Sequence, residues 1–174
     1  LRSMQVQPVN DFLQHADWTF PVPIAYGPVR FEELPDHCHR LGLSNPLIIT
    51  DCGTASLAFV ADAVDLLANA GIVSTVFHNI SQNPTEIDVR NAHSVFRSGN
   101  HDGVIAIGGG SGMDAGKATA LLAGTKHDLW EYDFEKFPPE LDPADKFPPL
   151  ICIPTTSGTG AETESTAMIT SLDR

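Results

Sequence analysis

A glycine-rich segment, Gly108-Gly-Gly-Ser-Gly-Met-Asp114, carries the strongest chemical signal in the sequence. It follows an apolar stretch of β type and leads into a helical pattern, so its backbone N–H groups lie at the start of a helix. The helix dipole favours an anion there, and residues without a Cβ let the backbone approach a phosphate closely. The alternative is a tight strand-to-helix turn without a ligand. Three consecutive glycines favour the phosphate site.

Two common phosphate-binding motifs do not match this segment. The G-x-G-x-x-G fingerprint needs glycine where Met113 stands, and the Walker P-loop needs glycine at Ser111 and a hydroxyl residue at Ala118. Lys117, further along the same expected helix, is interpreted as part of a solvated face. The segment therefore predicts phosphate binding of a type that neither motif describes.

Asp51 stands at the end of a short apolar strand. Nucleotide-binding domains use an acidic residue in this position to accept hydrogen bonds from an adenosine ribose. In the common Rossmann unit that residue follows the glycines by about 20 positions. Here it precedes Gly109 by 58 positions (109 − 51), so the strand order must differ. A turn-forming or helix-capping role before Cys52-Gly53 is equally open.

Two further segments are rich in polar groups. Pro154-Thr-Thr-Ser-Gly-Thr-Gly-Ala-Glu162 directly follows an expected strand, where hydroxyls and glycines suit a crevice for a polar ligand. The alternative is a Ser/Thr-rich turn. Asn83-Pro84-Thr85 is a weaker signal, since by itself it is a helix start. The histidines form no convincing metal site, because His37 and His39 point to different helix faces and the Asp11–His15 pair has no third ligand nearby.

The elements that position these residues alternate between strand and helix. Strands are expected at 46–50, 72–77, 103–107 and 150–153, and helices at 28–43, 54–70, 85–97 and 111–122. Near-continuous apolar strands joined by helices predict a Rossmann-like α/β fold, a parallel sheet with helices on both faces.

The segments around this core are less regular. Residues 18–26 are predicted to form an edge strand or a β-hairpin, 133–149 a Pro-rich surface loop, and 164–170 an alternating, β-like stretch. We expect residues 1–22 to form an N-terminal segment with an edge strand and residues 23–174 to form the α/β domain.

Composition excludes some partners. The chain of 174 residues has a formal net charge of −12, which repels nucleic acid and anionic lipid. Its three cysteines are far apart, which is typical of a reduced, cytoplasmic compartment. No apolar run approaches the roughly 20 residues of a membrane helix. We therefore expect a cytoplasmic protein without nucleic-acid or membrane partners.

Taken together, the two motifs at 108–114 and 154–162 resemble the hallmarks of the iron-containing alcohol dehydrogenase family. The order and spacing of Asp51, Asn83-Pro84-Thr85 and Trp130-Glu-Tyr-Asp133 agree with it. The resemblance runs from about Pro23 to Arg174, the N-terminal half of a family member. It implies NAD(P)-dependent hydride transfer between a small alcohol and an aldehyde or ketone, in a homo-oligomer. The family's helical domain with its divalent metal, Fe or Zn, is expected only in the complete enzyme and to be absent from these residues.

The resemblance also implies roles for single residues. Asp51 would contact the adenosine ribose and Asn83 the adenosine side, and Asp114 would lie toward the nicotinamide. The pyrophosphate cradle would be Gly109, Gly110, Ser111, Gly112 and Met113, and the opposite wall Thr155, Thr156 and Thr159. The Asp51 carboxylate favours NAD over NADP, because it repels a 2′-phosphate. Gly112 stands where the family usually has proline, so the first helical turn would be looser. No metal ligand and no catalytic residue can be assigned.

Two alternatives stay open. The chain could be a free-standing, non-catalytic nucleotide-binding module, or part of a related glycerol dehydrogenase or maleylacetate reductase. Without the metal domain, the isolated chain is expected to bind NAD weakly and to oxidise no alcohol.

Overall fold

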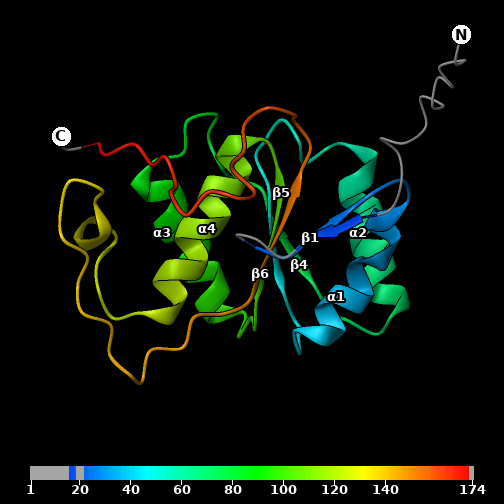
Figure 1. Cartoon of the computed structure of the whole chain (residues 1–174), viewed down its shortest axis with the longest axis horizontal. Helices are drawn as coiled ribbons and strands as arrows, with labels where there is room; N and C mark the ends of the chain where they lie inside the picture. The colour runs from blue at the N-terminus through cyan, green and yellow to red at the C-terminus, as the bar shows by residue number, and fades with distance from the viewer. Residues whose placement is uncertain (1–15, 19–21, 173–174) are drawn as a thin grey trace, which may run out of the picture.

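A four-stranded parallel sheet forms the centre of the molecule. The computed structural model describes residues 16–18 and 22–172 (Figure 1). The strands are β3 (Leu47–Ile49), β4 (Thr75–Phe77), β5 (Val104–Gly108) and β6 (Leu150–Pro154), in the order β4-β3-β5-β6. Every neighbouring pair is parallel. The predicted parallel α/β sheet is therefore confirmed.

Helices cover both faces of this sheet. Helices α1 (Leu34–Arg40) and α2 (Ala58–Asn69) lie on one side, and α3 (Glu86–Ser98) and α4 (Gly110–Gly124) lie on the other (Figure 1). Successive strand residues point to opposite faces. Ile48 accordingly joins the core under α1 and α2, whereas Leu47 and Ile49 join the core under α3 and α4. All three are fully buried, because β3 is an inner strand with both faces covered.

The strand order puts the predicted site residues side by side. The chain runs from β3 to its neighbour β4, and then α3 takes it back across β3 to β5 on the other side. The carboxyl ends of β3 and β5 are therefore adjacent at the point where the order reverses. Ligands of open α/β sheets bind at such a point. Asp51 follows β3 there, and Gly108 ends β5.

Several predicted boundaries are shifted for local reasons. The helix expected at 54–70 begins only at Ala58, because the Asp51 carboxylate accepts the N–H groups of Gly53 and Thr54, both at 2.9 Å, and holds a turn. The helix expected at 28–43 is two elements, the 3₁₀ helix η2 (Arg30–Glu33) followed by α1.

The strand expected at 72–77 is short at its beginning. Ile72 donates its N–H to Leu67 O at 2.9 Å, and Val73 donates to Ser44 O at 3.0 Å, so neither group is available to the sheet. The first of these bonds closes the end of α2, where Gly71 has φ +77°. Only Thr75–Phe77 remain to pair with β3.

The N-terminal strands form a hairpin of their own. Strands β1 (Ala16–Trp18) and β2 (Ile24–Tyr26) pair antiparallel in a separate two-stranded sheet, as the hairpin alternative predicted. The expected boundary at residue 22 falls between these two strands. Residues 1–15 lie outside the part that the structure describes.

The C-terminal part contains a long loop and an extended stretch. The short helix η3 (Leu129–Tyr132) precedes residues 133–149, which are all described and form neither helix nor strand, as predicted. The β-like stretch at 164–170 is not a strand. Its single bridge joins Thr170 to Thr85. Met168 and Thr166 bond to helix α4, and Thr170 bonds to the backbone of Pro84 and Glu86. No described helix is long and apolar enough to cross a membrane.

Candidate functional site

The glycine turn joins β5 to α4 and leaves the start of the helix open. Gly109 is the N-cap residue with an extended backbone, and no side chain in the described part of the chain caps it. The N–H of Met113 donates to Gly109 O at 3.1 Å and closes the first helical turn. The N–H groups of the three residues before it, 110–112, have no intrahelical acceptor. This terminus therefore offers backbone donors and the positive end of the helix dipole to an anion.

The glycines of this turn differ in what a side chain would meet. A Cβ on Gly109 would lie 3.2 Å from Thr156 Oγ1, and one on Gly112 would lie 3.1 Å from Ile107 O. These two residues are small because neighbouring chain packs against them. At Gly110, the nearest atom is Thr159 Cγ2, at 4.0 Å. Gly110 thus faces a space that a side chain would fill, as a phosphate cradle requires.

Asp51 lies beside this turn. A Cβ on Gly108, whose φ is +154°, would come within 3.1 Å of Asp51 Oδ2. The Oδ1 atom accepts two backbone N–H groups, while Oδ2 accepts Thr54 Oγ1 at 2.7 Å. Asp51 thus forms the turn that one interpretation expected. Because Oδ2 can still accept a second hydrogen bond, the turn is compatible with a ribose contact. That contact stays a prediction.

The threonine-rich loop after β6 forms the opposite wall. Gly108 pairs with Pro154 at the ends of β5 and β6, and the Thr155 N–H donates to Gly108 O at 2.9 Å. Thr156 faces Gly109, and Thr159 faces Gly110. The structure therefore brings the two predicted motifs together, although 46 positions separate Gly108 from Pro154 (154 − 108).

A cavity of about 320 Å³ adjoins the start of α4. Asn83 lies in its wall together with Ser111 and Asp114, and the Ser111 hydroxyl donates to Gln82 O. Residues 168–170 complete the wall. The sequence did not indicate them as site residues, because nothing in the stretch 164–170 shows where it packs.

Met113 lies apart from the other predicted cradle residues. Its side chain is fully buried against Ala106 and Ala161. Its N–H is already donated to Gly109 O. Met113 therefore contributes to the packing of α4 on the sheet, and its cradle role has no support in the geometry.

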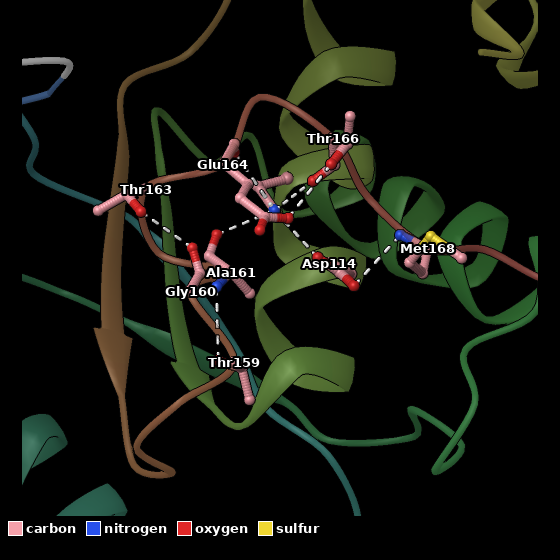
Figure 2. Close-up of polar contacts among 9 residues, drawn as sticks. Asp114, Thr159, Gly160, Ala161, Thr163, Glu164, Thr166 and Met168 are labelled. Atoms are coloured by element: carbon pink, nitrogen blue, oxygen red, sulfur yellow. Dashed lines mark hydrogen bonds and ion pairs between the residues drawn. The ribbon is translucent and has the colours of Figure 1, made fainter.

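Asp114 and Lys117 form a nearly buried ion pair on α4. Lys117 Nζ lies 3.0 Å from Asp114 Oδ1, and the Met168 N–H donates to Asp114 Oδ2 at 3.2 Å (Figure 2). Lys117 also donates to Ala161 O at 2.9 Å and to Thr166 O. The lysine side chain is only 13% exposed, so its assignment to a solvated face is wrong. The sequence signal for this ion pair was the spacing of Asp114 and Lys117, which lie three positions apart and therefore on one face of the helix.

Two of the three cysteine thiols are unreactive, whereas the third, Cys52 beside Asp51, is exposed. Burial raises the pKa of the Cys152 thiol on β6 to about 11, and that of Cys38 on α1 also to about 11. Both thiols are therefore neutral at pH 7 and are poor nucleophiles. The residues that the structure describes contain no group of three or more His, Cys, Asp or Glu side chains that could hold a metal. Asp11 and His15 lie outside them. The open start of α4 and the hydroxyl-rich wall beside it suit an anionic, polar ligand.

Known proteins share this arrangement. The family model of iron-containing alcohol dehydrogenase matches residues 21–174. The chain is 39% identical over 137 residues to 4-hydroxybutyrate dehydrogenase of Cupriavidus necator, which covers 78% of this chain and 35% of the relative. It is 31% identical over 158 residues to choline dehydrogenase of Bacillus subtilis (strain 168), covering 90% and 39%.

Solved structures agree with these sequences. A 1,3-propanediol oxidoreductase superposes with a TM-score of 0.75 at 30% identity, over 84% of this chain and 37% of that one. A sulfoacetaldehyde reductase from Bifidobacterium kashiwanohense, solved in complex with NAD⁺, superposes with a TM-score of 0.65 at 32% identity, over 79% and 35%. The chain thus spans little more than a third of the length of these relatives. It belongs to the iron-containing alcohol dehydrogenase family.

Proposed function

We propose that this chain is the dinucleotide-binding part of an NAD-dependent dehydrogenase that interconverts an alcohol and a carbonyl compound. The observation that carries the proposal is the open start of α4, where Gly110 has no atom nearer than Thr159 Cγ2 and lines a cavity. Two relatives are alcohol-oxidising dehydrogenases by name, and a third was solved with NAD⁺ bound.

The geometry suggests how the residues divide the work. The N–H groups at positions 110–112 would hold the diphosphate, and the hydroxyls of Ser111, Thr156 and Thr159 would surround it. The backbone of Thr155 holds this wall against β5, and Asn83 would line the cavity beside the cofactor. The bound nicotinamide supplies the chemistry by accepting or donating a hydride. The chain's own residues fix its position and exclude water on one side.

Asp51 supports NAD as the cofactor over NADP. Its carboxylate stands at the end of β3, where an adenosine ribose sits in related α/β folds. A free 2′-hydroxyl can donate to this carboxylate, whereas a 2′-phosphate would meet a like charge.

The metal that the family name implies does not fit the residues described here. They assemble no cluster of metal-ligating side chains, so we assign the metal to none of them and route no step of the reaction through it. In the complete enzyme a divalent metal, Fe or Zn, would be held by residues outside this chain.

The relatives suggest a small substrate. They are named for 4-hydroxybutyrate, choline and 1,3-propanediol, which are small hydroxyl compounds. We infer a substrate of this class in a cytoplasmic enzyme. The net charge of −12 argues against nucleic-acid and membrane partners. Assembly as a homo-oligomer is supported by the family resemblance alone.

The proposal is tested by titrating the purified chain with NADH and with NADPH, following nucleotide fluorescence and thermal melting. A ligand that binds only the folded state raises the melting temperature. We expect NADH to enhance fluorescence and raise the melting temperature, and NADPH to do so only at higher concentration. If both signals stay unchanged with both nucleotides, the chain is not a dinucleotide-binding domain.

A further inference from the structure

Residues 161–172, which we call the strap, cross helix α4 and reach the start of α3 (Figure 1). Within the described residues 161–172 no helix or strand forms. The strap is therefore held mainly by bonds to other elements. At one end, Lys117 and Asp114 bind it to α4. At the other end, the Thr170 N–H donates to Pro84 O at 2.8 Å, and the Leu172 N–H donates to Glu86 Oε1 at 3.3 Å.

Lys117 is fully committed to this contact. An ammonium group has three protons to donate. Its near partners are Ala161 O at 2.9 Å, Thr166 O, and Asp114 Oδ1 at 3.0 Å. Glu164 O, at 3.5 Å, is at the limit of a hydrogen bond. The described residues that line the cavity do not include Lys117. Lys117 therefore acts on a ligand only through the residues it holds.

Asp114 couples the lysine to the cavity. Its two carboxylate oxygens have different partners. Oδ1 binds the Lys117 ammonium group, and Oδ2 accepts a hydrogen bond from the Met168 N–H. Asp114 is 8% exposed and lies in the cavity wall, as does Met168. The pair therefore fixes the distance between α4 and the part of the strap that faces the cavity.

We propose that Lys117 and Asp114 are positioning residues that clamp the strap, so that residues 168–170 form one wall of the dinucleotide cavity. This inference rests on the proposed function, because it takes the cavity as part of the cofactor site. It adds a residue, Lys117, that touches no ligand and yet determines affinity. The part of the cofactor that enters this cavity depends on the strap, whereas the contact at Asp51, which is not in the cavity wall, does not.

The test uses Lys117→Met and Lys117→Arg in the full chain. Methionine has a similar length but no charge. Arginine keeps the charge, but its planar fork cannot direct three bonds to the same convergent acceptors. In both variants we expect hydrogen exchange of the peptide 162–170 to become at least about tenfold faster, because the Met168 and Thr170 N–H groups lose protection.

Nucleotide affinity separates positioning from general stability. We expect the Kd for NADH to rise about tenfold in both variants, because residues 168–170 lose the contacts that hold them in the cavity wall. ADP lacks the nicotinamide riboside and so makes fewer contacts to the cavity wall, and its Kd should rise less than that of NADH. Lys126→Met is the matched control, because Lys126 is 81% exposed and its ion pair with Asp142 is remote from the cavity. It should change neither quantity.

Each opposing outcome has a distinct meaning. If Lys117→Met retains wild-type affinity for NADH, the contacts of Lys117 to the strap do not determine affinity and the positioning role is refuted. If ADP loses as much affinity as NADH, Lys117 supports the whole domain and the proposal is also refuted. If the wild-type chain binds no nucleotide, the proposed function fails. Unchanged exchange of the strap in Lys117→Met would still refute the clamp independently.

Discussion

Helices α3 and α4 lie on the same face of the sheet, but they begin in opposite ways. At α3, Thr85 Oγ1 accepts the Asp88 N–H at 3.3 Å, and Asp88 Oδ2 accepts the Thr85 N–H at 2.8 Å. This capping box satisfies the first turn within the chain itself. At α4 the N-cap is Gly109, which has no side chain to offer. Side chains of the protein thus satisfy the N–H groups at the start of α3, whereas those at the start of α4 are left for a ligand.

The surroundings of the two helices sharpen this difference. Helix α3 is amphipathic and buries one stripe, whereas most residues of α4 are buried. Helix α4 is enclosed by the sheet, by α3 and by the strap (Figure 1). At its start, which opens into the cavity, the N–H groups of residues 110–112 lack intrahelical acceptors that a ligand anion can supply. We therefore expect a ligand anion to stabilise α4 and to leave α3 unaffected.

The largest expected effect is that of Gly110→Val. The nearest atom to a new Cβ is 4.0 Å away, so the substitution fills the cradle without a clash inside the protein. The Kd for NADH, measured by fluorescence titration, should rise at least about 100-fold, or about 2.8 kcal/mol. The melting temperature of the free chain should change little, and Gly110→Ala should have a smaller effect on binding. Full affinity in Gly110→Val would place the phosphate elsewhere and remove the contrast between the helices.

Asp51→Asn should have the next largest effect, on cofactor choice. Asparagine keeps an oxygen that can accept the N–H groups of Gly53 and Thr54, so the turn survives. The negative charge is lost, and with it the repulsion of a 2′-phosphate. The ratio of the Kd values for NADPH and NADH should fall about tenfold, or about 1.4 kcal/mol. An unchanged ratio would show that the ribose does not lie on Asp51.

Features encoded by neighbouring residues could be predicted from the sequence. The capping box needs only Thr85 and Asp88, and the glycine turn is contiguous, so both were found. Apolar runs such as 46–50 indicated buried parallel strands. The carboxyl ends of such strands meet at one edge, which is why Asp51 and the threonine-rich loop could be placed near the glycine turn.

Features that depend on distant partners could not be predicted. Lys117 bonds to Ala161, 44 positions away, and Asp114 to Met168, 54 positions away. Charge patterning on α4 alone made Lys117 look solvated. Residues 164–170 alternate like a strand, but they bond to two side chains of α4 and to the backbone at the start of α3, so no sheet takes them up. The burial of the Met113 side chain was missed for a related reason, because a motif position does not reveal which way the side chain faces.

Thr85→Ala tests the capped helix directly. It removes the side-chain acceptor of the Asp88 N–H and should lower the free energy of unfolding by about 1 kcal/mol. Urea denaturation measures this loss. Affinity for NADH should stay the same. Thr85→Ala thus lowers stability without affecting binding, whereas Gly110→Val weakens binding with little effect on stability. A large loss of NADH affinity in Thr85→Ala would show that the start of α3 also serves the ligand.

The smallest effect concerns Glu86, in the first turn of α3. The indole N–H of Trp130, at 2.7 Å, is the main cause that lowers the pKa of this carboxyl below its ordinary 4.5, followed by the Leu172 N–H and Arg90. A pKa that is lower in the folded state contributes stability that is present above pH 4.5. It is lost as the pH falls through the lower, folded value. Glu86→Gln should therefore flatten the dependence of unfolding free energy on pH in that acidic window. Near pH 7 the two proteins should show the same pH dependence. Urea melts at several pH values measure the difference. If the two proteins lose stability in parallel below pH 4.5, the Glu86 carboxylate does not tie the strap to α3, and the two helix starts differ only in their caps.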